Sequence, residues 1–138
     1  MHVLYALLCD HASISAEGKL SATGIFDTIN VVRFPTVHRD MTLAVQFEGA
    51  PADRGPHEIL LQVRNSEGRT LSSFTPPTLP LEGPDDALAL RGGLIVHFRD
   101  MMFERPDEYE IVVIVDSRFL HSVAFNVVQM RIQRDPAA

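Results

Sequence analysis

Apolar and polar side chains alternate along several segments of this chain. In Met41–Glu48, Leu43, Val45 and Phe47 fall on one face of an extended chain, and His57–Arg64 alternates in the same way. A period of two is the signature of half-buried β-strands, and no longer stretch has a convincing helical period. The predicted strands are Val3–Cys9, Lys19–Val32, Met41–Glu48, His57–Arg64, Arg69–Thr75, Leu94–Arg99, Glu110–Asp116 and Val123–Gln133. The pattern predicts an all-β fold, an antiparallel β-sandwich of about eight strands (Ig-like or C2-like) with little or no helix.

Two of these strands are apolar on both faces. Glu110–Asp116 is almost continuous Ile and Val, which is typical of a strand in the interior of a sheet. Val3–Leu8 is apolar at both even and odd positions, so we expect a central strand that is buried on both faces. In Leu94–Arg99, Ile95 interrupts an otherwise polar face.

Turn residues separate the strands. Ser15–Lys19 and Ser66–Arg69 each place a glycine between two alternating runs, which predicts hairpin loops. A third hairpin is expected at Asp116-Ser117-Arg118, which lacks glycine. Gly49–Pro56 is expected to be an exposed hairpin connection. Thr75–Asp86 contains four prolines, so we expect a loop that crosses from one sheet to the other.

Three positions suggest irregular strands. The apolar parity of Lys19–Val32 changes across Gly24, where we predict a bulge or bend. The parity of Val123–Gln133 also changes, and a bulge near Val127 would explain it. Gly92-Gly93 lies within an apolar alternating segment, so it indicates a bulge or kink rather than a phosphate-binding loop.

The composition fits one globular domain, which we place at residues 1–134 with a short C-terminal tail at 135–138. Of 138 residues, 46% are hydrophobic and 22% are charged, as in proteins that fold on their own. Twelve Lys and Arg stand against eighteen Asp and Glu, for a formal charge of -6, and no basic run is present. The charge pattern therefore argues against a nucleic-acid partner.

The N-terminal segment and the single cysteine bear on location. Met1–Asp10 has no cationic start, and its apolar run is too short to span a membrane. The only cysteine, Cys9, cannot close a disulfide within the chain, which favours a reducing compartment. Cys9 also continues the apolar parity of Tyr5 and Leu7, so we expect a buried structural thiol. We predict a cytoplasmic protein that does not bind membranes.

The order of several short motifs resembles a widespread family of uncharacterised bacterial proteins. The matching segments are Ala6-Leu7-Leu8-Cys9-Asp10, Gly18-Lys19-Leu20, Gly24-Ile25-Phe26-Asp27, Phe34-Pro35-x-Val37-His38, Glu48-Gly49 and the strand pair Tyr109 to Val127. The family pattern reads A-L-L-x-D, then G-K-L, then G-I-F-D. The resemblance implies a β-sandwich of unknown function and transfers no functional residues. Relatives often have Asp-Gly where this chain has Asp116-Ser117, which leaves the type of that hairpin open.

Candidate chemistry is sparse. The six histidines form no short metal-ligand spacing, and His11 beside Asp10 is more simply a solvated strand end than a metal ligand or base. No G-x-S-x-G motif supports a Ser-His-Asp triad. Asp85-Asp86 and Asp107-Glu108 would bind calcium only if loops at one end of the sandwich brought them together. We predict no catalytic, metal or cofactor site, and a protein that is not an enzyme.

The strongest candidate interface is Met101-Met102-Phe103. Three consecutive large apolar side chains cannot all face the core of one strand, so at least one is exposed or covered by something else. Burial under the proline-rich loop Thr75–Asp86 is one interpretation, and contact with another chain is the other. Pro77-x-x-Pro80 resembles a minimal polyproline ligand, although a rigid loop is the simpler interpretation.

These observations favour a non-enzymatic protein-interaction or assembly module that forms homo-oligomers. The alternative is a β-sandwich that binds a carbohydrate, a lipid head group or calcium in its end loops. The chain has no Trp and only Tyr5 and Tyr109, which makes an exposed platform for stacking sugars hard to build.

Overall fold

The computed structural model describes residues 1–131, and over this range it is built from strands. The elements in chain order are β1 (His2–Ile14), β2 (Leu20–Ile25), β3 (Thr28–Val31), β4 (Thr36–Gly49), the 3-10 turn η1 (Pro51–Asp53), β5 (Gly55–His57), β6 (Ile59–Arg64), β7 (Thr70–Phe74), β8 (Leu79–Leu81), β9 (Leu90–Phe103), β10 (Asp107–Val115) and β11 (Arg118–Gln129). The predicted all-β class is therefore confirmed. The predicted tail at 135–138 lies outside the described residues.

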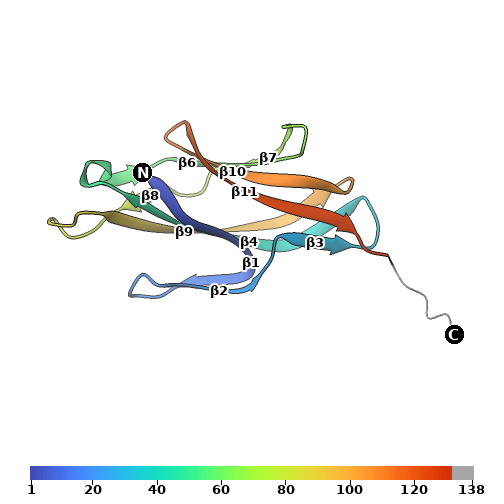
Figure 1. The fold of residues 1–138 in the computed structure, drawn as a ribbon, viewed down its shortest axis with the longest axis horizontal. Coiled ribbons are helices and arrows are strands. Elements are labelled where there is room, and N and C mark those ends of the chain that lie inside the picture. The colour runs from blue at the N-terminus through green and yellow to red at the C-terminus, as the bar shows by residue number, and fades with distance from the viewer. Residues whose placement is uncertain (132–138) are drawn as a thin grey trace.

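The strands form two large sheets that face each other (Figure 1). One sheet has the order β2-β1-β4-β9, and the other has the order β3-β11-β10-β6-β7. Strands β5 and β8 form a separate two-stranded ribbon. The pairings are antiparallel except that of β3 with β11, which is parallel. This arrangement confirms the predicted antiparallel sandwich.

The strand count is eleven rather than about eight. The additional strands, β3, β5 and β8, have four, three and three residues. Such short segments carry too few positions to show alternation, and two of them contain prolines that normally argue against a strand. They form because β3 pairs with β11 and because β5 and β8 pair with each other, and only the folded chain brings these partners together.

The core fills the space between the two large sheets. On β4, Leu43, Val45 and Phe47 are fully buried, as their alternation predicts. Aromatic rings extend the core at the end of β9, where the Phe103 ring lies 4.9 Å from the Tyr109 ring and 6.0 Å from the Phe125 ring, centroid to centroid. Edge-to-face contacts of this kind add to the burial of apolar area.

The β1–β2 hairpin belongs to the same sheet as β4 and β9, but its end folds over the outer face of these two strands. Figure 1 shows this hairpin on the side of β4 and β9 that faces away from β10 and β11. Cys9, Ala12 and Ala44 are buried in a small cluster of their own, against which Leu20 and Ile95 pack. Ile95 therefore interrupts the polar face of β9 because the hairpin covers that position.

The expectation that Val3–Leu8 is buried on both faces is wrong. Leu4 is 39% exposed and Tyr5 is 41% exposed, although Leu8 is buried. Pairing of β1 with β2 begins only at Cys9, so the first half of β1 has β4 as its sheet neighbour on one side only. The apolar character of this segment comes from one face only, because Val3, Ala6 and Leu8 pack in or against the main core.

The parity change across Gly24 marks a crossing between the two sheets. Lys19–Val32 is not one bent strand, because the chain leaves β2 at Ile25 and enters the opposite sheet as β3 at Thr28. Gly24 has φ +66° at this crossing, and the Asp10 side chain occupies the space that a Cβ would need.

The bulge predicted near Val127 is absent, since the β3–β11 register runs unbroken through it and the β10–β11 register is regular up to it. The register shift lies between Val113 and Ile114. Val128 and Met130 change the apolar parity because they are exposed.

The connections between strands follow the predictions in part. Glycines at 18 and 68 adopt φ +80° and +79° in the two predicted hairpin loops, which confirms them. The stretch Thr75–Asp86 does cross from one large sheet to the other, and it contributes β8 on the way. Gly49–Pro56 is also a crossing between sheets and not a hairpin connection.

Gly92 and Gly93 form no bulge. Both continue the regular β4–β9 register, opposite Phe47 and Gln46. Glycine is present at both positions because neighbouring elements approach the strand closely, and not because the strand is bulged.

Candidate functional site

The three residues of the predicted interface, Met101, Met102 and Phe103, end up in different environments. Met101 and Phe103 are buried in the core, with 4% and 0% of their surface exposed. Met102 is 58% exposed. The prediction that at least one of the three is not buried is confirmed. Burial under the proline-rich loop is wrong, because Phe103 packs against Tyr109 and Phe125 between the sheets.

Met102 lies in a small apolar patch with Val37. The two residues are directly opposite each other in the β4–β9 register, so their side chains project from the same face of the sheet. Val37 is 48% exposed. The β1–β2 hairpin covers this face further along, over Ala44 and Ile95. We call Met102 and Val37 the Met102 patch; the sequence revealed its first member, but Val37 could be found only from the register.

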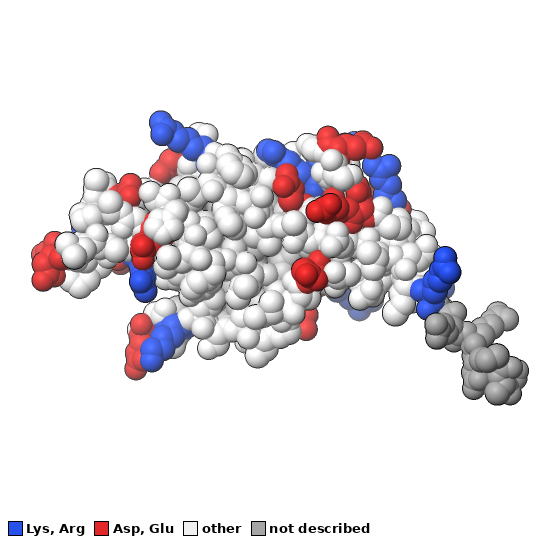
Figure 2. Space-filling view, viewed as in Figure 1, with Lys and Arg blue, Asp and Glu red and all other residues white. Residues whose placement is uncertain are grey.

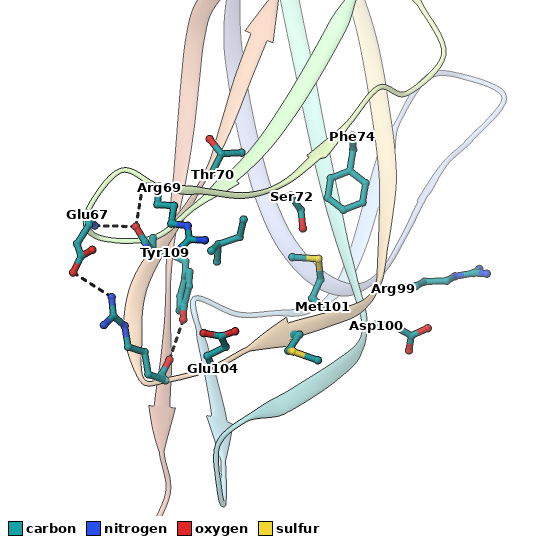
Figure 3. A pocket seen from close by; sticks show the side chains of 14 residues that line it. Glu67, Arg69, Thr70, Ser72, Phe74, Arg99, Asp100, Met101, Glu104 and Tyr109 are labelled. Carbon is teal, nitrogen blue, oxygen red and sulfur yellow. Dashed lines mark hydrogen bonds and ion pairs between the residues drawn. The ribbon is translucent and has the colours of Figure 1, made fainter.

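A hollow of about 640 Å³ lies beside the patch, between β7 and β9 (Figure 3). These two strands are the last in their sheets, so each has one free edge here. Figure 3 shows Phe74 and Met101 facing each other across the hollow, with Tyr109 at its other end. The lining residues are Asn65, Glu67, Arg69, Thr70, Leu71, Ser72, Phe74, Arg99, Asp100, Met101, Met102, Glu104, Arg105 and Tyr109.

Both free edges carry features that discourage indiscriminate strand pairing. On β7, Val63 pairs with Ser72 and Arg64 pairs with Thr70, which leaves Leu71 as a bulged residue. On β9, Asp100 has φ +53°, so the strand is kinked there. Bulges, kinks and charges are common devices that protect edge strands. The apolar face at Met102 is therefore a stronger candidate contact than the strand edges themselves.

Polar interactions close the Tyr109 end of the hollow. Arg105 lies 3.2 Å from Glu67, and the Tyr109 hydroxyl donates to the Arg105 carbonyl oxygen at 2.9 Å. Burial raises the pKa of Tyr109, so the phenol stays protonated as a donor. A hydrogen bond from Ser66 lowers the pKa of Asp107. Asp107 thereby also fixes the adjacent β6–β7 loop, because its carboxylate accepts from the Ser66 amide at 3.4 Å.

Charges of both signs are scattered over the molecule. Figure 2 shows one face on which Lys, Arg, Asp and Glu lie mainly around the margin, and neither sign forms a continuous stripe there. The hollow itself is lined by three arginines and three acidic residues. No helix in residues 1–131 has the length and apolar character needed to cross a bilayer.

The acidic pairs proposed as calcium ligands are far apart along the fold. Asp85-Asp86 precedes β9 and Asp107-Glu108 follows it, so this strand of 14 residues separates them. Both oxygens of the Asp107 carboxylate already accept main-chain hydrogen bonds, from Ser66 and Glu108. Within residues 1–131 no group of three or more His, Cys, Asp or Glu is placed to hold a metal ion.

The remaining sequence candidates have structural roles. Asp10, the neighbour of His11, packs over Gly24 at the crossing between sheets. Cys9 is fully buried, and desolvation raises the pKa of its thiol, as expected for a structural cysteine. Pro80 of Pro77-x-x-Pro80 pairs with Pro56 in the β5–β8 ribbon, which shows a rigid element rather than a free polyproline ligand.

Sequence reasoning missed a polar cluster at the opposite end of the molecule. His57 Nδ1 lies 2.6 Å from Asp116 Oδ2, and His57 Nε2 lies 2.6 Å from the main-chain oxygen of Asp53. These residues are 59 and 4 positions apart in the chain. No short motif links them, since only the docking of the β10–β11 turn against β5 brings His57 and Asp116 together.

Comparison with known proteins gives a family and two weak structural likenesses. Residues 4–128 match a family described as "Family of unknown function (DUF6941)". No curated protein matches the sequence.

The structural likenesses are to parts of larger enzymes. One is to the alkylpurine DNA glycosylase AlkC of Pseudomonas fluorescens, bound to DNA with an abasic site analogue (TM-score 0.49, 15% identity, 88% of this chain and 30% of that chain). The other is to the β-glucuronidase of Bifidobacterium dentium (TM-score 0.41, 10% identity, 91% of this chain and 17% of that chain). This chain spans less than a third of either enzyme, and the similarity is too low to support an argument about function.

Proposed function

Because the chain belongs to the DUF6941 family, whose function is unknown, we propose its role from its own surface: a non-enzymatic protein-interaction module that forms homo-oligomers. The observation that carries the proposal is the Met102 patch. Met102 is 58% exposed and lies opposite Val37, which is 48% exposed, on a sheet face that the β1–β2 hairpin leaves uncovered. Exposed large apolar side chains that are adjacent, and not scattered singly, are typical of contact surfaces.

The surroundings of the patch suit contact with a second copy. Arg39, Arg99 and Asp100 are exposed close by on β4 and β9, and they carry both signs of charge. In a twofold dimer the same surface meets itself, so a basic residue of one copy can face an acidic residue of the other. A polar rim around an apolar centre is the usual anatomy of such interfaces.

Two apolar side chains can form only the centre of an interface. Stable complexes bury about 800 Å² on each partner, so the rim and the adjacent part of β9 must contribute to the contact. Residues at the centre of an interface carry most of its binding free energy. Met102 is therefore the position at which one substitution has the largest effect.

Sedimentation analysis at high micromolar concentration tests the proposal. The unchanged chain is expected to sediment as a dimer or higher oligomer. Met102→Lys places a charge at the centre of the contact, and we expect it to dissociate the oligomer without loss of fold, because the side chain projects into solvent. A monomeric unchanged chain at these concentrations contradicts the proposal.

Leu88→Lys is the matched control for Met102→Lys. Leu88 is 93% exposed in the loop before β9, so the same substitution there adds the same charge to the surface. This variant is expected to remain associated. Dissociation of both variants to the same extent would mean that net charge, and not the Met102 patch, controls association.

Calorimetric titration with calcium and with a panel of glycans tests the alternative function. A ligand-binding sandwich would release or absorb heat with one of these ligands, and such heat would overturn the interaction proposal as the primary function. We further propose a cytoplasmic location, which the single buried free thiol of Cys9 supports.

A further inference from the structure

One of the side chains that hold the β10–β11 turn is a histidine of β5. His57, at the end of β5, has 13% of its side chain exposed. Its Nδ1 faces Asp116 Oδ2 and its Nε2 faces the Asp53 carbonyl oxygen, both at 2.6 Å. A carboxylate and a carbonyl only accept hydrogen bonds, so both ring nitrogens must carry protons to satisfy the two contacts. A neutral imidazole has one N–H and leaves its second nitrogen pointing at an oxygen lone pair.

We propose that His57 is a pH-sensitive latch: when doubly protonated it fastens the β10–β11 turn to the η1–β5 segment, and loss of one proton loosens that turn. The proposal is independent of self-association, because none of these residues belongs to the Met102 patch. It assigns a conformational role to a cluster that no sequence motif marks.

The backbone of the β10–β11 turn is strained and requires stabilising contacts. Asp116 and Ser117 form its two central residues, with φ +49° and +67°. Two consecutive left-handed residues are the signature of a type I′ turn, in which the second position is normally glycine. Ser117 is strained in this conformation, and the contacts of Asp116 offset the strain. Asp116 Oδ1 also accepts from the Glu58 amide at 3.0 Å, and the Asp116 amide donates to the Glu58 carbonyl oxygen at 2.9 Å.

The charged groups around His57 favour its protonated form. Asp116 lies on the turn and Asp53 on η1, and both contribute to the raised pKa of His57, the hydrogen bond that the imidazole donates to the Asp116 carboxylate most of all. The Met1 amino group lies 3.4 Å from Asp53 Oδ2, so this positive charge pairs with the Asp53 carboxylate and not with the His57 imidazole. The Arg54 guanidinium is occupied by the carbonyl oxygens of Gly83 and Pro84.

The direction of the pH effect follows from these shifts. A histidine whose pKa is raised in the folded state adds stability below its unfolded pKa of about 6.5, and that stability is lost as the pH rises through the folded value. Asp116 acts in the opposite direction, because the hydrogen bond from His57 lowers its pKa and stability is lost only as the pH falls below the usual carboxylate range. The latch is therefore closed below about pH 6.5 and opens as the pH rises through the raised pKa of His57.

NMR titration of the histidine rings in the full chain is the direct test. We expect the pKa of His57 to lie above 6.5, and Asp116→Asn to lower it, because Asn removes the charge but keeps a side-chain acceptor of similar size. The other histidines are internal references, since none of them bonds Asp116 in the described structure. A His57 pKa at or below 6.5 in the unchanged chain, or one unaffected by Asp116→Asn, overturns the proposal.

A second measurement links the titration to the turn. The free energy of unfolding in urea is expected to fall between pH 6.5 and pH 8.5 for the unchanged chain. The His57→Gln variant keeps a side-chain donor but does not titrate, so we expect the part of this decrease that the histidine causes to be absent. Hydrogen exchange of the Glu58 and Asp116 amides is expected to accelerate over the same range more than base catalysis alone predicts. The proposal is contradicted if the free energy of unfolding depends equally on pH in both proteins, or if the exchange of these amides follows base catalysis only.

Discussion

Gly92 and Gly93 are adjacent on β9, yet each leaves room for a different element. A Cβ on Gly92 would lie 2.9 Å from the main-chain oxygen of Pro80, on the side of the β5–β8 ribbon. A Cβ on Gly93 would lie 2.8 Å from Ile14 Cδ1, on the side of the β1–β2 hairpin. The pair therefore lets the strand be packed closely from both faces at one point.

The two alanine substitutions should differ in cost. Gly92→Ala must displace the backbone of β8, and we expect it to lower the free energy of unfolding by about 1–3 kcal/mol. Gly93→Ala meets the end of a flexible side chain and gains strand propensity, so we expect a change within about 1 kcal/mol. Urea unfolding of the two variants side by side measures the difference. Equal losses would show that the cost comes from the loss of glycine itself and not from its neighbours.

Sequence reasoning at this scale correctly placed the face of each side chain but could not identify its neighbour. Alternation predicted the buried faces of Leu43, Val45 and Phe47, because a period of two fixes which side of a strand a residue faces. It gave no means to choose between a bulge and close packing at Gly92-Gly93. That choice depends on β8 and the hairpin, which are distant from the pair along the chain or too short to predict.

At the scale of single elements, two hairpin turns contain a residue in the left-handed conformation but use different residue types for it. Gly68, in the β6–β7 turn, has φ +79°, and open space surrounds the position of a Cβ. Ser117, in the β10–β11 turn, has φ +67° without being glycine. The first turn has glycine in the left-handed conformation, which glycine adopts without strain. The second turn has serine there and depends on contacts with residues outside the turn.

Exchanging the residue types should shift stability in opposite directions. Ser117→Gly removes the left-handed strain and is expected to raise the free energy of unfolding by about 1 kcal/mol. Gly68→Ala introduces the same strain and is expected to lower it by about 1 kcal/mol. Urea unfolding at pH 6, where the His57 latch is closed, measures both. A loss of stability in Ser117→Gly would mean that the serine makes contacts worth more than its strain.

The element boundaries that the sequence could not predict are those at crossings between sheets. Lys19–Val32 has no proline or loop-like run to show that it divides into β2 and β3. The parity change at Gly24 was visible, but a bend and a crossing give the same sequence pattern. Asp10 closing over Gly24 is a tertiary contact that decides between them. The same limit explains why the sequence predicted only Met102 of the Met102 patch, since Val37 is placed beside it only by the β4–β9 register.

The molecule as a whole is a sandwich in which the β1–β2 hairpin of one sheet also covers part of that sheet's outer face. The main core between the two large sheets contains 22 buried residues, whereas the cluster under the β1–β2 hairpin contains Cys9, Ala12 and Ala44 alone. Such a small apolar contact stabilises the hairpin much less than the core stabilises the sheets. We therefore expect the hairpin to lift from the sheet in a local opening, well before global unfolding.

Cys9 reports that opening directly. Its side chain is fully buried between the hairpin and the outer face of the sheet, and desolvation raises the pKa of its thiol, so a thiol reagent must wait for the hairpin to lift. Ile14→Ala removes the contact between the hairpin and Gly93 while leaving the main core intact. We expect this variant to react several-fold faster with a chromogenic disulfide reagent, with a much smaller loss in the free energy of global unfolding.

Leu88→Ala is the control for the thiol measurement, because Leu88 is 93% exposed and is not part of the hairpin cluster. Its reaction rate should equal that of the unchanged chain. If Cys9 in every variant reacts at a rate set by global stability alone, the hairpin does not open separately and unfolds together with the rest of the sandwich. If Ile14→Ala reacts faster at nearly constant global stability, the chain has two cooperative units, and the smaller one is the part of the molecule that moves first.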